Sequence, residues 1–512
     1  GVYGDAHALT TSGCSAGVCI TATMSAAKAI NGDAGISAPG STSSSVAGTV
    51  NNNGLFSTSG LLGFLQTVRN ARTSTMGPVN LSELPGNAAL DGQDNFALSG
   101  SIVVLVGIHT VEVVIGTGAE IKSSGSIVVT ASLSQAAQVA SASSTEQPTR
   151  TLPSGEQEPG TDTALALSFG IGVFINKAKA TVQDGAALDA HDSITVHSEV
   201  LHPFLISNPL AVINPLDYLS SGPAGWAYFN DGTLGFASNL FNVWVIATAS
   251  DAETAVGGAL AVTVFDTEAI TTIENGALVN QLEDARFRDG AQAVAVTATT
   301  LMKRINVGGN VGLSLNVSGV EGLVSDFRSA SSGFEKFKSF SSLANPFGVG
   351  GAKSSIGATV MVDVAVTKTE AIIEGGALVT AGHGGLEVLS DTNSLSIIIA
   401  VSGSGGGGGE FGFVAVVPIT YVGRTTTAEV KDNAVLKVVG DTQLSATDDL
   451  LHVVVAGGVT SSSSTGIGAS IAVTVLERTT TAHLGTLGAG SNLAGLHVFA
   501  ENTGGSYSLA LV

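Results

Sequence analysis

The sequence predicts an all-β protein, and more specifically a β-helix (β-solenoid) built from repeats of about 54 residues. The stretch RTTTA occurs at Arg424–Ala428 and again one repeat later, at Arg478–Ala482. Apolar residues alternate with others before both copies, as in half-buried strands. The chain is also rich in small and β-branched residues, with 66 glycines and only 5 % aromatic residues. Such a composition suits flat, tightly stacked strands.

The composition sets limits on the classes of function. With 512 residues and 44 % hydrophobic residues, the chain is long enough for a repeat array and apolar enough to fold. Its 20 basic against 41 acidic residues give a net charge of −21. This balance argues against binding to nucleic acid or anionic membranes, which requires clustered Lys and Arg. It leaves weak binding of cations open.

The sequence shows no membrane-spanning segment and no signal peptide. The strongest apolar run, Ser101–Gly116, contains His109 and Glu112 and alternates like a strand. Because the chain begins with Gly1, we expect that any targeting segment was removed or lies outside this fragment.

The frame around RTTTA recurs along the chain. Upstream copies replace the threonines, so we interpret RTTTA as part of the periodicity and the threonines as a surface of the repeat, not as a functional site. The copies are Val111–Ala131, Gly170–Ala190, Ala259–Val279, Val362–Gly382, Phe413–Val430 and Gly466–Leu484, preceded by a half unit at Asp5–Ala26.

Each unit is expected to contain an alternating strand, a short strand ending near Ala428 or Ala482, a turn, a second alternating stretch and a third strand. Asp184-Gly185 and Asn275-Gly276 mark turns, because such pairs tolerate positive φ. The third strand is of the type Ser394–Val401 or Leu450–Gly457. A unit of this length predicts two or three coils. The turn positions are unequally spaced along the chain, at Gly118, Gly185, Gly276, Gly376 and Asn433.

All the extra length falls between the third strand of one unit and the first strand of the next, which predicts insertions on one edge of the array. Helical spacing of Leu61, Leu62, Leu65 and Val68, and of Phe334, Phe337 and Phe340, predicts that two insertions are partly helical. The expected segments are a half repeat (1–26), an insertion with a helix (27–95), a repeat (96–142), a Pro/Gly/Glu loop (143–162), a repeat (163–201), an aromatic-rich insertion (202–240), a repeat (241–319), a Phe-rich helical insertion (320–350), a repeat (351–402), a Gly-rich loop (403–412), a repeat (413–464) and a truncated repeat (465–512).

Two interpretations of the aromatic residues in the insertions remain open. They cap the flank of the array as small satellite cores, or they form an exposed contact patch for a surface glycan or protein. The candidate contact residues are Tyr218, Trp226, Tyr228, Phe229, Phe334, Phe337 and Phe340.

Both ends of the chain lie within a unit. Because one unit cannot close its own sheets, open strand edges are expected to be covered. The chain is therefore expected either to stack end to end with copies of itself or to continue into neighbouring repeats.

The repeats resemble those of very large secreted bacterial adhesins and filamentous-haemagglutinin-like exoproteins. The resemblance is carried by Gly466–Val475 with Thr479–Ala482, by Thr369–Ala381 and by Ala180–Ala190, and it covers about two-thirds of the chain. It implies a right-handed parallel β-helix at an extracellular or cell-surface location. It also implies a spacer or presentation shaft, and it brings no catalytic residues.

We therefore expect a non-enzymatic extracellular structural protein, either a filament subunit or an adhesin shaft whose edge insertions mediate adhesion or self-association. The alternatives are a β-helix lyase or glycosidase and a calcium-stabilised surface-layer protein. The carboxylate groupings Asp448-Asp449, Asp91 with Asp94, and Glu283 with Asp289 are interpreted as solvated turns. Calcium is possible, but Asp91–Asn95 matches only a fragment of a calcium loop.

Two pairs of residues complete the list of candidates. Cys14 and Cys19 are close enough in sequence for a small disulfide loop, and two free thiols are the alternative. His191 and His197 are interpreted as surface residues on the strand face opposite Ile194 and Val196. No residue is assigned as catalytic, cofactor-binding or metal-binding.

Overall fold

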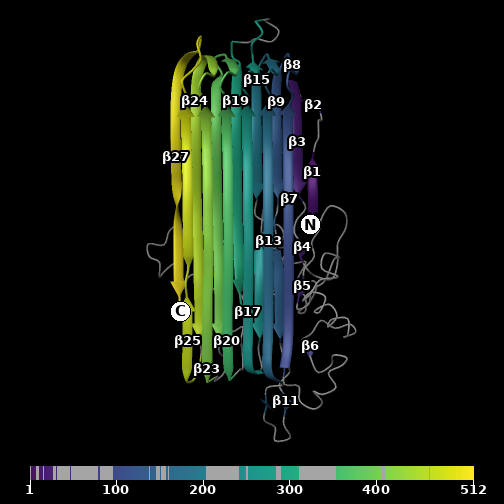
Figure 1. Ribbon diagram of the computed structural model, residues 1–512, viewed down its shortest axis with the longest axis vertical. Coiled ribbons are helices and arrows are strands. Elements are labelled where there is room, and N and C mark those ends of the chain that lie inside the picture. The colour runs from purple at the N-terminus through teal and green to yellow at the C-terminus, as the bar shows by residue number, and fades with distance from the viewer. Residues whose placement is uncertain are drawn as a thin grey trace, which may run out of the picture.

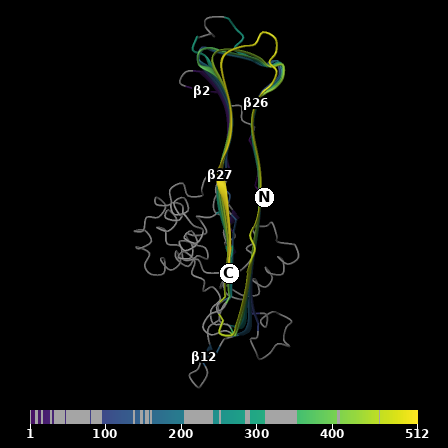
Figure 2. The same ribbon diagram turned by 90° about the vertical axis from the view of Figure 1, so that its left-hand side faces the viewer.

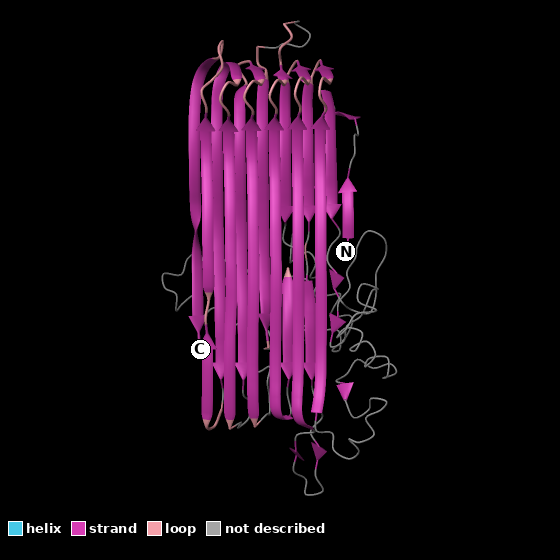
Figure 3. Cartoon of the chain, viewed as in Figure 1, coloured by secondary structure: helices cyan, strands magenta, loops and turns pink. Residues whose placement is uncertain are grey.

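In this computed structural model the chain forms two large β-sheets that face each other (Figures 1 and 2). The structure describes residues 96–135, 161–202, 242–249, 252–283, 290–310, 353–404, 410–460 and 462–512, together with shorter strand segments elsewhere. Within these residues every regular element is a strand (Figure 3). The all-β prediction is confirmed, and this part of the chain contains no helix long and apolar enough to span a membrane.

Sheet A consists mainly of long strands that run parallel to one another. They are β7 (Phe96–Ile115), β13 (Thr161–Val182), β17 (Ala252–Ile273), β20 (Ser354–Ile373) and β23 (Phe411–Val430), followed by β25 (Thr465–Ser470) and β26 (Val473–Leu484), which both pair with β23. At the opposite edge, β1 (Val2–Ala6) pairs with β7 in parallel and β6 (Val79–Asn80) pairs with it antiparallel.

Sheet B contains the return strands, which are also parallel. Its main strands are β3 (Gly17–Ala26), β9 (Ser126–Gln135), β15 (Ser193–His202), β19 (Ala293–Gly309), β22 (Gly385–Ser404), β24 (Val435–Thr460) and β27 (Asn492–Leu511). Shorter members are β2 (Thr11–Cys14), β4 (Ile30–Asn31), β5 (Val46–Ala47), β10 (Val139–Thr145), β16 (Val243–Ala249) and the corner strands β8 (Glu120–Ser123), β14 (Ala187–Ala190), β18 (Leu278–Val279) and β21 (Leu378–Ala381). A separate antiparallel pair joins β11 (Arg150–Thr151) to β12 (Gln157–Glu158).

Each repeat unit contributes one long strand to each sheet, except that in one unit the strand of sheet B is interrupted: β15 ends at His202, and β16 continues its place beside β19 from Val243 on. The prediction that all insertions fall between the third strand of one unit and the first strand of the next is therefore wrong for the insertion between β15 and β16. Thr163 of β13 pairs with Phe96 of the preceding unit and with Thr254 of the following one. The sequence intervals between Phe96, Thr163 and Thr254 equal those between the turn positions Gly118, Gly185 and Gly276. Equivalent residues of successive units are therefore neighbours. The expectation of two or three coils per unit is wrong, because equivalent strands of successive units pair directly and each unit forms a single layer. The second stretch and the third strand form one continuous strand, such as β22.

A tight turn with one residue at positive φ follows each long strand of sheet A. In the turn Gln183–Ala186, the Ala186 N–H donates to the Gln183 carbonyl at 3.1 Å. The predicted turn positions all have φ between 69° and 82°, and glycine accepts this conformation most readily. They are Gly118, Gly185, Gly276, Gly376 and Asn433.

The end of the sheets next to these turns encloses an apolar core. Val182 is paired with Ile115 on one side and Ile273 on the other, and all three are buried. Ile194 and Val196 of β15 face them from sheet B with no exposed surface, as predicted, whereas His191 and His197 lie outward. Burying one such aliphatic side chain contributes about 1.5–3 kcal/mol.

Several sequence predictions concern residues whose side chains the structure does not describe. The backbone places Cys14 on β2 and Cys19 on β3, but their side chains lie outside the description, as do the predicted helical insertions, Asp91–Asn95 and Asp289. The same holds for all seven aromatic contact candidates. These predictions stay predictions.

Candidate functional site: a buried polar seam

A row of polar side chains crosses the space between the two sheets at about the middle of the long strands. We call this row, together with the buried residues Thr369, Thr426, Arg304 and Asp363 beside it, the polar seam. On sheet A, four inward residues are neighbours in successive strands and are at most 4 % exposed: Asn176, Thr267, Thr367 and Arg424. From sheet B, Thr300, Thr392 and Asp448 are likewise in register and buried. Because buried polar groups cost free energy unless they are hydrogen-bonded, their partners define the seam.

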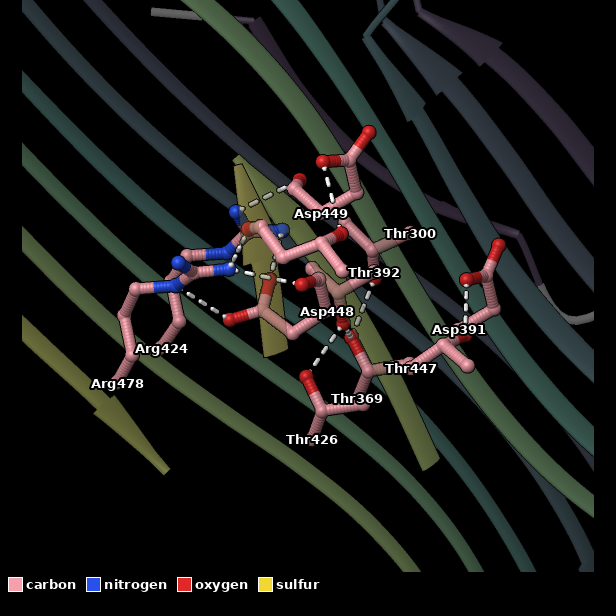
Figure 4. A network of polar contacts seen from close by, with 11 residues as sticks. Thr300, Thr369, Asp391, Thr392, Arg424, Thr426, Thr447, Asp448, Asp449 and Arg478 are labelled. Atoms are coloured by element: carbon pink, nitrogen blue, oxygen red, sulfur yellow. Dashed lines mark hydrogen bonds and ion pairs between the residues drawn. The ribbon is translucent and has the colours of Figure 1, made fainter. Parts of the chain in front are cut away.

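Threonine hydroxyls connect the two sheets within the seam (Figure 4). Thr369 of β20 is hydrogen-bonded to Thr300 and to Thr392 of sheet B, each at 2.8 Å. Thr392 continues the chain of hydroxyls to Thr426 of β23, also at 2.8 Å. A hydroxyl donates one hydrogen bond and accepts others. A chain of threonines that alternate between the two sheets can therefore give each hydroxyl a hydrogen-bond partner.

Asp448 lies between two arginines at the end of this hydroxyl chain (Figure 4). Its Oδ1 is 2.7 Å from Arg424 Nη2 and its Oδ2 accepts from Arg478 Nε at 2.8 Å. The Arg424 and Asp448 side chains are at most 1 % exposed, whereas Arg478 is 16 % exposed. Burial lowers the pKa of Arg424 to about 10, with Asp448 opposing the shift, so the guanidinium stays charged at neutral pH.

Two interpretations of these residues are therefore corrected. The RTTTA copies do pair residue for residue, as periodicity requires. Their threonines are not simply a surface, because Thr426 is fully buried and only its neighbours point outward. Asp448 does not belong to a solvated turn but lies within β24 and is 1 % exposed.

A second buried ion pair joins Arg304 of β19 to Asp363 of β20. Arg304 Nη1 donates to Asp363 Oδ1 at 2.9 Å and to Oδ2 at 3.1 Å, and both side chains are 1 % exposed. Thr263 and Asn306 donate to Oδ1 as well, at 2.6 and 2.9 Å. A buried carboxylate needs such a set of donors, because an arginine alone does not replace its hydration.

The same guanidinium lies over an aromatic ring. Arg304 Cζ is 4.6 Å from the centroid of Phe265, which stacks on Phe174 at 4.9 Å. His202 meets Phe265 edge-on at 5.7 Å. Cation–π contacts strengthen when they are removed from water, so the ring of Phe265 helps to hold Arg304 in place.

Two buried histidines flank this ion pair and are held neutral. Burial, with a contribution from the positive charge of Arg304, lowers the pKa of His202 to about 3. Burial also lowers the pKa of His452 to about 4, although the carboxylate of Asp363 opposes that shift. His452 Nε2 lies 3.2 Å from the Thr420 hydroxyl.

The geometry of the seam fits a role in holding the sheets together. The Asp363 carboxylate accepts from several donors, the Asp448 carboxylate forms ion pairs with two arginines, and both are turned away from solvent. Every contact named above joins different strands. No group of three His, Cys, Asp or Glu side chains able to hold a metal ion occurs among the described residues.

Comparison with protein-family models finds no matching family, and comparisons with curated proteins and with solved structures find no significant match.

Proposed function

We propose that the chain is a non-enzymatic structural protein of the extracellular space or cell surface, a segment of a right-handed parallel β-helix. Its units stack at right angles to their strands, and the resulting array serves as a shaft or filament. The observation that carries the proposal is the uniform pairing of successive units: equivalent residues adjoin through β13, β17, β20 and β23 whatever the length of the connection between them.

The last unit supports the proposal through its exposed inward side chains. Leu476 is 37 % exposed, whereas its neighbour Val422 in the preceding unit is 3 % exposed. Val498 is 47 % exposed, and its neighbour Leu444 is fully buried. The two members of each pair point the same way, so the difference comes from the presence or absence of a further unit on top. A stacked unit would bury Leu476 and Val498.

Stacking on this edge has two versions. In a filament, the edge meets another copy of the chain. In an adhesin shaft, it meets further repeats, and the edge insertions contact a glycan or protein. In both versions the strands lie across the axis of the array, so the axis repeats every ~4.8 Å, the spacing of neighbouring strands.

The test is light scattering with negative-stain imaging of the purified chain, beside a Val498→Lys variant. The filament version predicts long assemblies that Val498→Lys shortens to particles one 50.9 kDa chain long, because a lysine on the stacking edge opposes burial. His497→Lys is the matched control, because His497 points outward on the same strand. Single chains in every sample would exclude the filament version, and a fold without parallel stacked strands would exclude both.

A further inference from the structure

The outer surface of sheet A is apolar over the half of each strand farthest from the tight turns. We call this surface the apolar face. Every second residue points outward there, in the ranges Ile102–Ile108, Leu165–Ile175, Val256–Val264, Ile356–Val366 and Phe413–Tyr421. Apart from Gly258, Ala358 and Ala415, these outward residues are Leu, Ile, Val, Phe or Tyr.

The side chains of the apolar face are partly open to solvent. They are half-buried by their neighbours within the sheet, and Val366 and Ile419 are each 40 % exposed. The face continues onto the last unit, where Ile471 and Val475 are 57 % and 44 % exposed. Soluble proteins rarely expose a continuous apolar patch of more than a few hundred Å² unless the patch is an interface.

Charged residues border the apolar face at both ends. Toward the turns, Lys177 and Glu268 form an ion pair at 2.7 Å, and Lys368 follows in the next strand. At the far end, Lys353 and Glu253 form another ion pair. Both borders therefore combine positive and negative side chains.

Sheet B shows the opposite situation at the same height. Its outward residues there are also apolar, but they are buried: Ile305 is 7 %, Ile397 7 % and Val455 2 % exposed. An apolar outer face is thus covered on one sheet and uncovered on the other.

We infer that the apolar face of sheet A packs against the same face of a second copy of this chain. Its ranges supply as many side chains as the ~20–30 residues that each partner contributes to a stable interface. Flat sheets of aliphatic residues pack face to face at about 10 Å. A two-fold axis would bring the charged borders of the two copies together. Because each border contains both positive and negative side chains, like charges would not face each other along the whole border.

Lipid is the other class of occupant, and the charge of the chain argues against it. The net charge of −21 repels anionic headgroups.

The experiment compares the mass and width of assemblies formed by the intact chain and by a Val262→Lys/Val362→Lys variant. These residues are neighbours on adjacent strands at the centre of the face and point outward, so lysines there leave the interior unchanged. Ile270→Lys is the matched control, because Ile270 points outward on β17 but beyond the charged border. Circular dichroism checks that all variants fold.

The expected result is a wild-type mass in multiples of two chains, or filaments two chains wide, and half that mass or width for the double variant. Ile270→Lys should leave both unchanged. Width reports on this face and length on the stacking edge, so the inference and the proposed function fail separately. A single-chain width in the wild type would overturn the inference. So would flotation of the wild type, but not of the double variant, with phosphatidylcholine vesicles.

Discussion

The two halves of strand β20 follow opposite rules. Near the turn, Ile373 points into an apolar core while Lys368 and Glu370 point outward. In the other half, Asp363 is buried while Val362 and Val364 point to the outer surface. Strict alternation determines which side chains share a face of the strand, but not which face is buried. The packing of the two sheets against each other determines the buried face. In the second half of β20, the buried face contains an ion pair and the valines lie on the outer surface.

The largest expected effect comes from removing one partner of the enclosed ion pair. Asp363→Leu leaves Arg304 buried without a counter-charge and should lower the free energy of unfolding by about 3–5 kcal/mol, measured by urea denaturation. Glu370→Leu on the outward side of the same strand is the control and should cost at most about 1 kcal/mol. Equal losses would show that the two halves are not energetically different.

The double variant Arg304→Met/Asp363→Leu sharpens the same point. Replacing both charges by apolar side chains removes the cost of their burial, so most of the stability lost in Asp363→Leu should return. A double variant as unstable as the single one would mean that Asn306 and Thr263, left without the carboxylate, carry the main cost.

Lowering the pH should destabilise the half of the sheets that contains the buried ion pair before it destabilises the half next to the turns. His202 and His452 have pKa values of about 3 and 4 in the fold, below the ordinary value of 6.5. Unfolded chains bind these protons first, so stability is lost as the pH falls from about 6.5 toward 4, by about 3 kcal/mol for His452 alone. Urea denaturation from pH 7 to 4 measures the loss, and His452→Gln should flatten it. An unchanged slope would exclude His452 as its source.

Exchanging valine for threonine tests the two environments with a nearly constant shape. Val388→Thr puts a hydroxyl into the apolar core and should cost about 1–3 kcal/mol, because Val388 is fully buried. Val362→Thr on the apolar face should change the free energy of unfolding of a single chain by less than about 0.5 kcal/mol. Thermal unfolding at low concentration distinguishes these results, and a large loss in Val362→Thr would show that the outer valines stabilise the single chain.

A small effect is also expected at the border between the halves. Lys177 and Glu268 are 31 % and 19 % exposed, so Lys177→Ala should cost no more than about 1 kcal/mol, and the cost should shrink in high salt. A cost that salt does not change would mean that Lys177 acts by packing its aliphatic chain.

The features that the sequence predicts well are local. Asp184-Gly185 and Asn275-Gly276 form turns because positive φ is a property of one or two residues, and the spacing of such turns matched the pairing of the strands. Asn433 takes the same conformation without being glycine.

The polar seam escaped prediction because it depends on how the sheets face each other. Asp448-Asp449 resembles a turn when considered alone. The available signal was positional: Asp448 occupies the place in its unit that Thr300 and Thr392 occupy in theirs, and all three face inward. The outward valines of β20 have the composition of a core, so hydrophobicity alone would have placed them inside.

The pairing of whole strands between units has a mechanical consequence. Tension spread across the last unit, along the stacking axis, acts on every backbone hydrogen bond between β23 and β26 and between β24 and β27 at the same time. The bonds share the load, so none ruptures far below the force that separates the whole layer. The ion pair between Arg478 and Asp448 adds a further contact between the last two units. The last unit should therefore separate from its neighbour suddenly, at a single force.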